Sequence, residues 1–175
     1  MVQGGTKYRG CTVSSDELLP PDTDDTLTGS GLAAEKAKRL TKIDDLRTAG
    51  TNPYPYRFDR THTLAELRAL HGGLEAGTET EFEVSAAGRV MLMRDSGKLI
   101  FATMRDRDGE VQLFVSKAII GDDAFETIKG LDLGDWVGVH GTVMTTKKGE
   151  LSIKVQSCEL LSKAVRPMPD KWHGL

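Results

Sequence analysis

Four side chains in the second half of the chain have the chemistry to hold a planar, hydrogen-bonding ligand. Phe101 offers a ring face for stacking, and Gln112 offers an amide that both donates and accepts hydrogen bonds. Arg94 carries a flat guanidinium that can stack or bind a phosphate, while the Glu150 carboxylate can accept a hydrogen bond from a base N–H. Together these groups suit an unpaired nucleic-acid base, whose face stacks and whose edge hydrogen-bonds.

Each of these residues also has an ordinary structural interpretation. Phe101 shares one strand face with Leu99 and Thr103, opposite Ile100 and Ala102, and alternation alone leaves open which face is inside. Gln112 and Glu150 could also be solvated strand residues, whereas Arg94 is the basic residue that we expect to contact the ligand. Further basic residues lie near expected loops and could contact a phosphate backbone or simply face solvent: Arg89, Lys98, Lys147 and Lys148.

Period-two alternation predicts the strands that would position these groups. Strands are expected at about 82–94, 99–106, 110–117, 135–146 and 150–162, with a helix at 121–130. Gly88 allows the sharp strand curvature that a small barrel needs. Three strands, a helix and two strands is the order of an OB-fold. The predicted fold is therefore mainly β with flanking helices, a five-stranded OB-fold barrel (β-β-β-α-β-β) preceded by an N-terminal helix.

Two helical segments are predicted before the barrel. Residues 32–49 have an apolar stripe and a basic face, and Gly50 can end that helix. Prolines favour an extended path after it, and Thr63 with Glu66 forms a capping box that begins a short helix. The expected division is a disordered tail or linker at 1–31, a helical extension at 32–80, the barrel at 81–162 and a connector at 163–175.

The charge distribution limits how nucleic acid could bind. Residues 32–60 carry a net charge of +3, whereas residues 61–161 carry −5 with eleven basic and sixteen acidic side chains. Nonspecific electrostatic binding over the whole barrel would therefore be weak, and recognition must rely on a local site. The basic residues of the first helix (Lys36, Lys38, Arg39 and Lys42) either follow an RNA backbone or form a solvated face.

Several other functional classes find no support in the sequence. The two cysteines and four histidines are scattered, so no metal site is predicted. No apolar run approaches the roughly 18 residues of a membrane span, and no secretory signal is evident, so a cytoplasmic location is expected. The pair Gly97–Lys98 lacks the other residues of a phosphate-binding loop, and no cofactor is expected for this chain.

Five segments in order resemble the lysyl-tRNA synthetase family, a class II family in the lysyl, aspartyl and asparaginyl subgroup. The segment GRVMLMRDSGKLIFATMRDRDGEVQLF resembles the first three strands of that subgroup's anticodon-binding OB-fold. The other four narrow the resemblance to the lysyl enzymes, and together the match covers roughly residues 32–175: NPYPYRFDRTHT, LDLGDWVGVHGTV, TKKGELSIKV and LLSKAVRPMPDKWHGL.

The resemblance implies specific roles. It implies an anticodon-binding region for lysine tRNA, in which an aromatic at Phe101 stacks on the central anticodon base. It also implies that Gln112 and Glu150 read uridine edges, with Arg94 beside them. The final segment resembles the connector to a catalytic domain that would ligate lysine to tRNA with ATP and magnesium. This chain alone is expected to be inactive and without membrane contact, and its parent to be a homodimer.

Alternatives remain at this point. The parent could be a stand-alone synthetase or an actinobacterial fusion to a membrane domain that makes lysylphosphatidylglycerol. The domain itself could be a nonspecific single-strand binder or a protein-interaction OB-fold. An aspartyl-type anticodon domain fits less well, because NPYPYRFDRTHT and DKWHGL favour the lysyl type.

Overall fold

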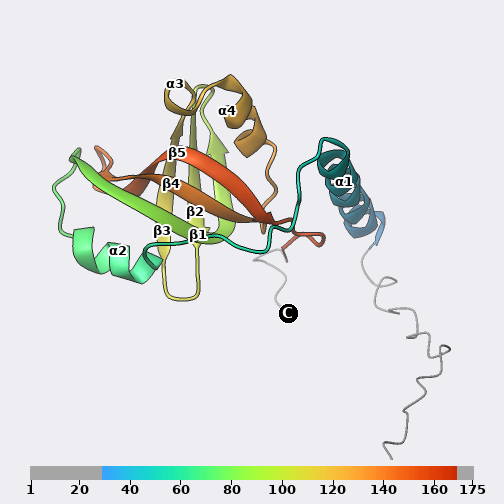
Figure 1. Cartoon of the computed structure of the whole chain (residues 1–175), viewed down its shortest axis with the longest axis horizontal. Helices are drawn as coiled ribbons and strands as arrows, with labels where there is room; N and C mark the ends of the chain where they lie inside the picture. Colours follow the sequence, from blue (N-terminus) through green and yellow to red (C-terminus); the bar gives the residue numbers. More distant parts are fainter. Residues whose placement is uncertain (1–28, 169–175) are drawn as a thin grey trace, which may run out of the picture.

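Five strands close into a barrel in the computed structural model, which describes residues 29–168 (Figure 1). They are β1 (Glu79–Asp95), β2 (Leu99–Arg105), β3 (Glu110–Ser116), β4 (Trp136–Thr145) and β5 (Leu151–Ser162). Their order around the barrel is β1-β2-β3-β5-β4. The β3–β5 pair is parallel and the other four pairs are antiparallel. The predicted five-stranded OB-fold is confirmed.

Four helices accompany the barrel: α1 (Gly29–Thr48), α2 (Leu64–His71), α3 (Lys117–Ile120) and α4 (Asp122–Lys129). The helix expected at 121–130 is confirmed as α4, and the short helix α3 precedes it in residues for which no helix was predicted. Gly121 separates them with a φ of 83°, a conformation that glycine adopts without strain. α1 begins three residues before the predicted start, because the low helix propensity of its glycines hides it in the sequence. The predicted tail up to residue 28 and residues 169–175 of the predicted connector lie outside the described residues.

Alternation along the strands decides which side chains form the core. Ile100 and Met104 are fully buried and Ala102 is 4% exposed, so this face of β2 points into the barrel. The other face, with Phe101, points outward and is only partly covered. Side chains from α2 and α4 complete the core, and these helices lie at opposite ends of the barrel in Figure 1.

The curvature of β1 depends on Gly88. A Cβ atom at this position would lie 2.6 Å from the Met104 side chain and 2.8 Å from the Arg105 carbonyl oxygen. Because both distances are shorter than real Cβ contacts, only glycine lets β2 approach β1 so closely. The register of β1 against β2 then shifts between Val90 and Leu92, just before the last residues of β1.

α2 closes one end of the barrel in a fixed orientation. Its N-cap Thr63 forms the predicted capping box with Glu66, whose carboxylate accepts a 2.7 Å hydrogen bond from the Thr63 N–H. The Asp106 carboxylate accepts a 2.9 Å hydrogen bond from the Leu64 N–H, which ties the helix to the β2–β3 hairpin. Leu64 and Leu67 are both 1% exposed and join the core. The helix is therefore held at its N-terminus and along its apolar face.

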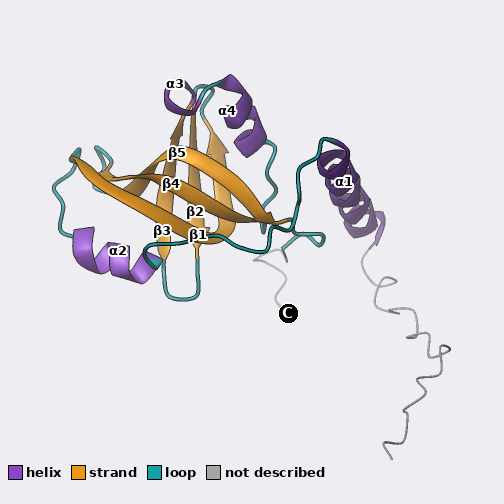
Figure 2. Cartoon of the chain, viewed as in Figure 1, coloured by secondary structure: helices purple, strands orange, loops and turns teal. Residues whose placement is uncertain are grey.

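α1 stands beside the barrel in Figure 2. Polar side chains make the hydrogen bonds that join the two. Ile43, 4% exposed, is the one fully buried apolar residue of α1 among those described, while Leu32 and Leu40 are 36% and 44% exposed. The Arg39 guanidinium instead enters the junction, where it donates hydrogen bonds to three backbone carbonyls, those of Leu133, Ala164 and Arg166 at 3.2, 3.1 and 3.3 Å.

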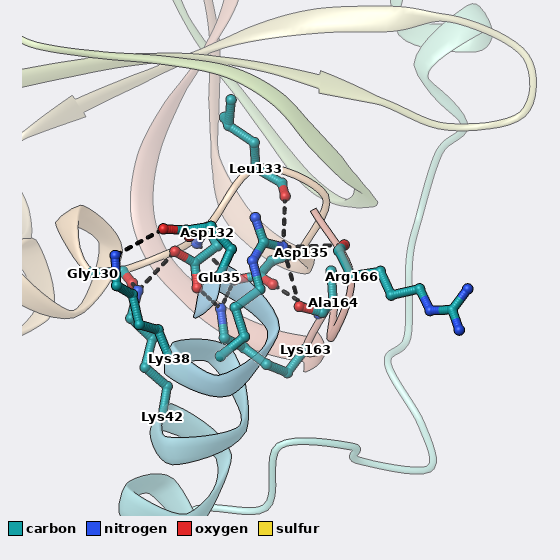
Figure 3. Close-up of polar contacts among 11 residues, drawn as sticks. Glu35, Lys38, Lys42, Gly130, Asp132, Leu133, Asp135, Lys163, Ala164 and Arg166 are labelled. Atoms are coloured by element: carbon teal, nitrogen blue, oxygen red, sulfur yellow. Dashed lines mark hydrogen bonds and ion pairs between the residues drawn. The ribbon is translucent and has the colours of Figure 1, made fainter. Parts of the chain in front are cut away.

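A buried ion-pair cluster lies at the same junction (Figure 3). Lys163 is 4% exposed and donates to the fully buried Asp135 at 2.7 Å and to Asp132. Lys42 of α1 also donates to Asp132, at 2.7 Å. Two of the four basic residues singled out in the first helix, Arg39 and Lys42, therefore hold α1 against the barrel. Among residues 29–168, no helix combines the length and hydropathy required to cross a membrane.

Candidate nucleic-acid interface

A groove of about 990 Å³ lies on the outer face of the barrel. Its floor is formed by β1, β2 and β3, and its walls by the turn between β4 and β5 and by α2. Six of the eight residues singled out from the sequence line it: Arg94, Phe101, Gln112, Lys147, Lys148 and Glu150. Strand register brings them together from segments more than 50 residues apart.

Phe101 lies on the groove floor in the middle of β2. Its Cα partners are Arg94 on β1 and Phe114 on β3, so these three residues occupy one row across the sheet. The Phe101 and Phe114 rings meet edge to face, with centroids 5.5 Å apart and an interplanar angle of 66°. The ring is half-buried, so its environment differs from that of the core residues on the opposite strand face. This settles the strand-face question that alternation left open.

Gln112 lies in the next row, opposite Thr103 on β2 and Ser152 on β5. Its Oε1 lies 3.0 Å from the Ser152 hydroxyl, which can donate to it. Ser152 is itself fully buried, so this contact fixes one end of the amide. Among residues 29–168, the Gln112 Nε2 has no protein partner. The amide therefore presents its two N–H donors toward the groove.

Arg94 is the next-to-last residue of β1 and does not lie in the following loop, because β1 continues to Asp95. It is directly opposite Phe101, and directly opposed residues project from the same sheet face. The neighbouring Asp95 carboxylate is occupied by Lys129 at 2.8 Å and by the Gly97 N–H at 2.8 Å. The hydrogen bond from Lys129, reinforced by that from Gly97, lowers the pKa of Asp95. Within the described residues Arg94 has no ion-pair partner, so its charge faces the groove uncompensated.

Glu150 lies in the turn just before β5, one residue earlier than the strand position expected for it. Its backbone is fixed by Thr146, which donates its N–H to the Glu150 carbonyl at 2.9 Å and accepts from the Glu150 N–H at 3.1 Å. Its side chain is 54% exposed, and the carboxylate Oε1 lies 3.9 Å from an Arg68 nitrogen. The carboxylate is therefore held at the groove wall by a rigid turn while remaining accessible.

The predicted backbone contacts divide into two groups. Lys147 and Lys148 lie in the β4–β5 turn, on the same wall as Glu150, and are exposed. Arg89 and Lys98 lie outside the groove. The Arg89 guanidinium instead lies over the Trp136 ring, 5.6 Å from its centroid, and Lys98 is exposed in the β1–β2 turn.

Sequence reasoning missed other groove residues, among them Arg68, Leu92 and Phe114. Phe114 could have been found, because it lies two residues from Gln112 in β3 and alternation puts both on one face. Arg68 had no comparable signal, since its place depends on where α2 docks. In the described part of the chain, no three His, Cys, Asp or Glu side chains converge on a metal position.

Relatives of known identity match most of this sequence. Residues 84–161 match the tRNA anticodon family, described as an OB-fold nucleic acid binding domain. Lysine–tRNA ligase of Synechococcus sp. (strain CC9311) is 47% identical over 137 residues, 78% of this chain and 28% of that protein. The enzymes of Enterococcus faecalis (strain ATCC 700802 / V583) and Nostoc punctiforme (strain ATCC 29133 / PCC 73102) are 48% and 45% identical over 139 and 148 residues. These alignments cover 78% and 80% of this chain, and 28% and 26% of those proteins.

The chain thus spans between a quarter and a third of the length of the curated relatives that it matches. The matched family region includes β2, β3 and β4 and most of β1 and β5, and so it contains the three strands that form the groove floor. Residues 84–161 therefore form an OB-fold of the tRNA anticodon family, and most of the chain is homologous to the part of lysine–tRNA ligases that it matches.

Proposed function

We propose that the groove binds the anticodon of a lysine tRNA and reads its uridines. The observation that carries the proposal is the convergence of Phe101, Gln112, Arg94 and Glu150 on one open groove. Anticodon bases are single-stranded, so both their faces and their pairing edges are available to a protein. OB-folds use this barrel face for oligonucleotides, which makes the location consistent with the family.

Stacking supplies a large part of the binding energy. The Phe101 ring is braced by Phe114 and leaves a face toward the groove, and base–aromatic stacking contributes about 1–3 kcal/mol per base. Arg94, directly opposite on β1, is placed to extend the platform or to hold the adjoining phosphate. The central anticodon base stacks on Phe101 in this arrangement.

Base identity is read by complementary hydrogen-bonding groups. The Gln112 Nε2 donates to a uracil carbonyl, because Ser152 occupies the amide oxygen at 3.0 Å. The Glu150 carboxylate accepts from a uracil N3–H. A cytosine carries no proton at N3, so it cannot make the same contact. Lys147 and Lys148 are exposed on the same wall and offset the repulsion between Glu150 and the RNA backbone.

The activity of the whole protein follows from its relatives and is part of the proposal. We place this chain in a protein that ligates lysine to tRNA with ATP and magnesium, using a catalytic domain beyond this sequence. The chain alone then binds RNA without activating lysine. A cytoplasmic location, a homodimeric parent, and the choice between a stand-alone synthetase and a membrane-domain fusion stay predictions.

The test is a titration of the chain with lysine tRNA and with the same tRNA carrying a changed central anticodon base. Both titrations are run at two salt concentrations, because phosphate contacts weaken with salt whereas stacking and base-edge contacts persist. A preference for the native anticodon that survives added salt supports the proposal. Equal and salt-sensitive binding contradicts it and favours a nonspecific binder, and an absence of binding favours a protein-interaction domain.

A further inference from the structure

We propose that Arg68 of α2 is a positioning residue for Glu150, so that a helix outside the matched family region sets the uridine preference of the groove. The inference rests on the proposed function and deepens it. Arg68 lines the groove wall, and its guanidinium lies between the start of β3 and the turn before β5. It is the one α2 residue among the groove-lining side chains of the described part.

A hydrogen bond to the barrel holds the Arg68 guanidinium close to Glu150. One terminal nitrogen donates a 2.8 Å hydrogen bond to the Glu110 carbonyl oxygen at the first residue of β3. The same nitrogen lies 3.9 Å from the Glu150 Oε1, too far for a hydrogen bond but close enough for charge attraction. The attraction draws one carboxylate oxygen toward α2. The other oxygen has no protein partner within residues 29–168 and stays available for a base N–H.

The rigidity of α2 makes this attraction directional. Asp106 holds the first N–H of the helix, and the two buried leucines anchor its inner face. Arg68 follows Leu67 directly and thus projects from a helix that cannot rotate without exposing core. A flexible arginine would have to be ordered on binding, whereas this one is ordered beforehand.

Arg68 is half-exposed, so its effect should be modest and specific. Exposed charge pairs couple weakly, and we expect Arg68→Ala to lower the uridine-over-cytidine preference by about two- to fivefold. Arg68→Lys keeps the charge and should keep most of the preference. In a Glu150→Gln background, Arg68→Ala should leave the preference unchanged, because the group that it positions no longer carries charge.

The probes are RNA hairpins that carry the anticodon UUU, or the same loop with one uridine replaced by cytidine or by 3-methyluridine. Arg107→Ala is the matched control, since it removes the same charge from the adjacent β2–β3 hairpin, where the side chain is 93% exposed. Arg107→Ala should weaken binding of the uridine and cytidine hairpins equally. Thermal unfolding of each variant separates lost structure from lost recognition.

The outcomes separate this inference from the proposed function. A wild-type chain that binds the uridine and cytidine hairpins equally removes the proposed function itself. A wild-type preference that Arg68→Ala leaves intact, or an equal loss for both hairpins as in Arg107→Ala, overturns the positioning role alone. A preference that falls with Arg68→Ala and not with Arg107→Ala, and only while Glu150 is present, establishes it.

Discussion

Replacing Phe101 with alanine separates a binding role from a core role more sharply than any other single change. The ring is half-buried on the outer strand face and touches Phe114 edge to face. Removing that contact should cost about 1 kcal/mol of folding free energy. Removing a stacking platform should cost about 1–3 kcal/mol of binding, equivalent to about a 5- to 150-fold loss of affinity for lysine tRNA.

Ile100→Ala is the matched control, because Ile100 is the neighbouring residue in β2 and is fully buried. That change should cost about 2–5 kcal/mol of stability. Urea unfolding of both variants, together with titration of the folded protein with lysine tRNA, gives the two quantities. If Phe101→Ala destabilises the chain as much as Ile100→Ala does, or binds tRNA as tightly as the wild type, the reasoning is refuted.

Three further predictions concern stability and reactivity. Lys163→Met should lower the free energy of unfolding by about 3–5 kcal/mol, because it removes the ion-pair partner of the fully buried Asp135. Lys38→Met, which breaks an exposed ion pair, is the control. An equally small effect of the two changes would contradict the prediction. Burial raises the pKa of Asp132, but hydrogen bonds from Lys163 and Lys42 outweigh it and leave that pKa below 3.8. The stabilising contribution of Asp132 is therefore present above pH 3.8 and is lost as the pH falls through the lower folded-state pKa. Asp132→Asn should flatten the plot of unfolding free energy against pH in the acid range. An unchanged plot would contradict this role of Asp132. Burial raises the pKa of the Cys158 thiol to about 12, so its peptide should label slowly with thiol reagents at neutral pH, and fast labelling would count against a buried thiol.

The barrel could be predicted because its information is local. Each strand carries its own alternation, and α4, between β3 and β4, falls where the periodicity changes. The junction of α1 could not be predicted in the same way. Arg39 binds carbonyls 94, 125 and 127 residues away, and a helix that docks through a charged side chain gives no apolar signal for its contact face.

In the candidate site, too, the strand assignments could be predicted from sequence, whereas the spatial relations between residues could not. Gln112 and Phe101 could be assigned to neighbouring strands from sequence, but their row relation depends on the register of β2 against β3. The inward or outward orientation of Phe101 needed the closed barrel, since both faces of β2 are largely apolar. Arg89 lies beside Trp136 because the register of β1 and β4 pairs them, a relation that no local pattern reveals.

The most direct test of the central claim is to map the RNA on the protein surface by nuclear magnetic resonance. The isotope-labelled chain is titrated with a hairpin that carries the lysine anticodon, and amide and side-chain shifts are followed. We predict that the largest changes occur at Arg94, Phe101, Gln112 and Glu150, including the Gln112 side-chain amide. Changes concentrated on α1 or around Arg89 and Trp136, with the groove unaffected, would contradict the account.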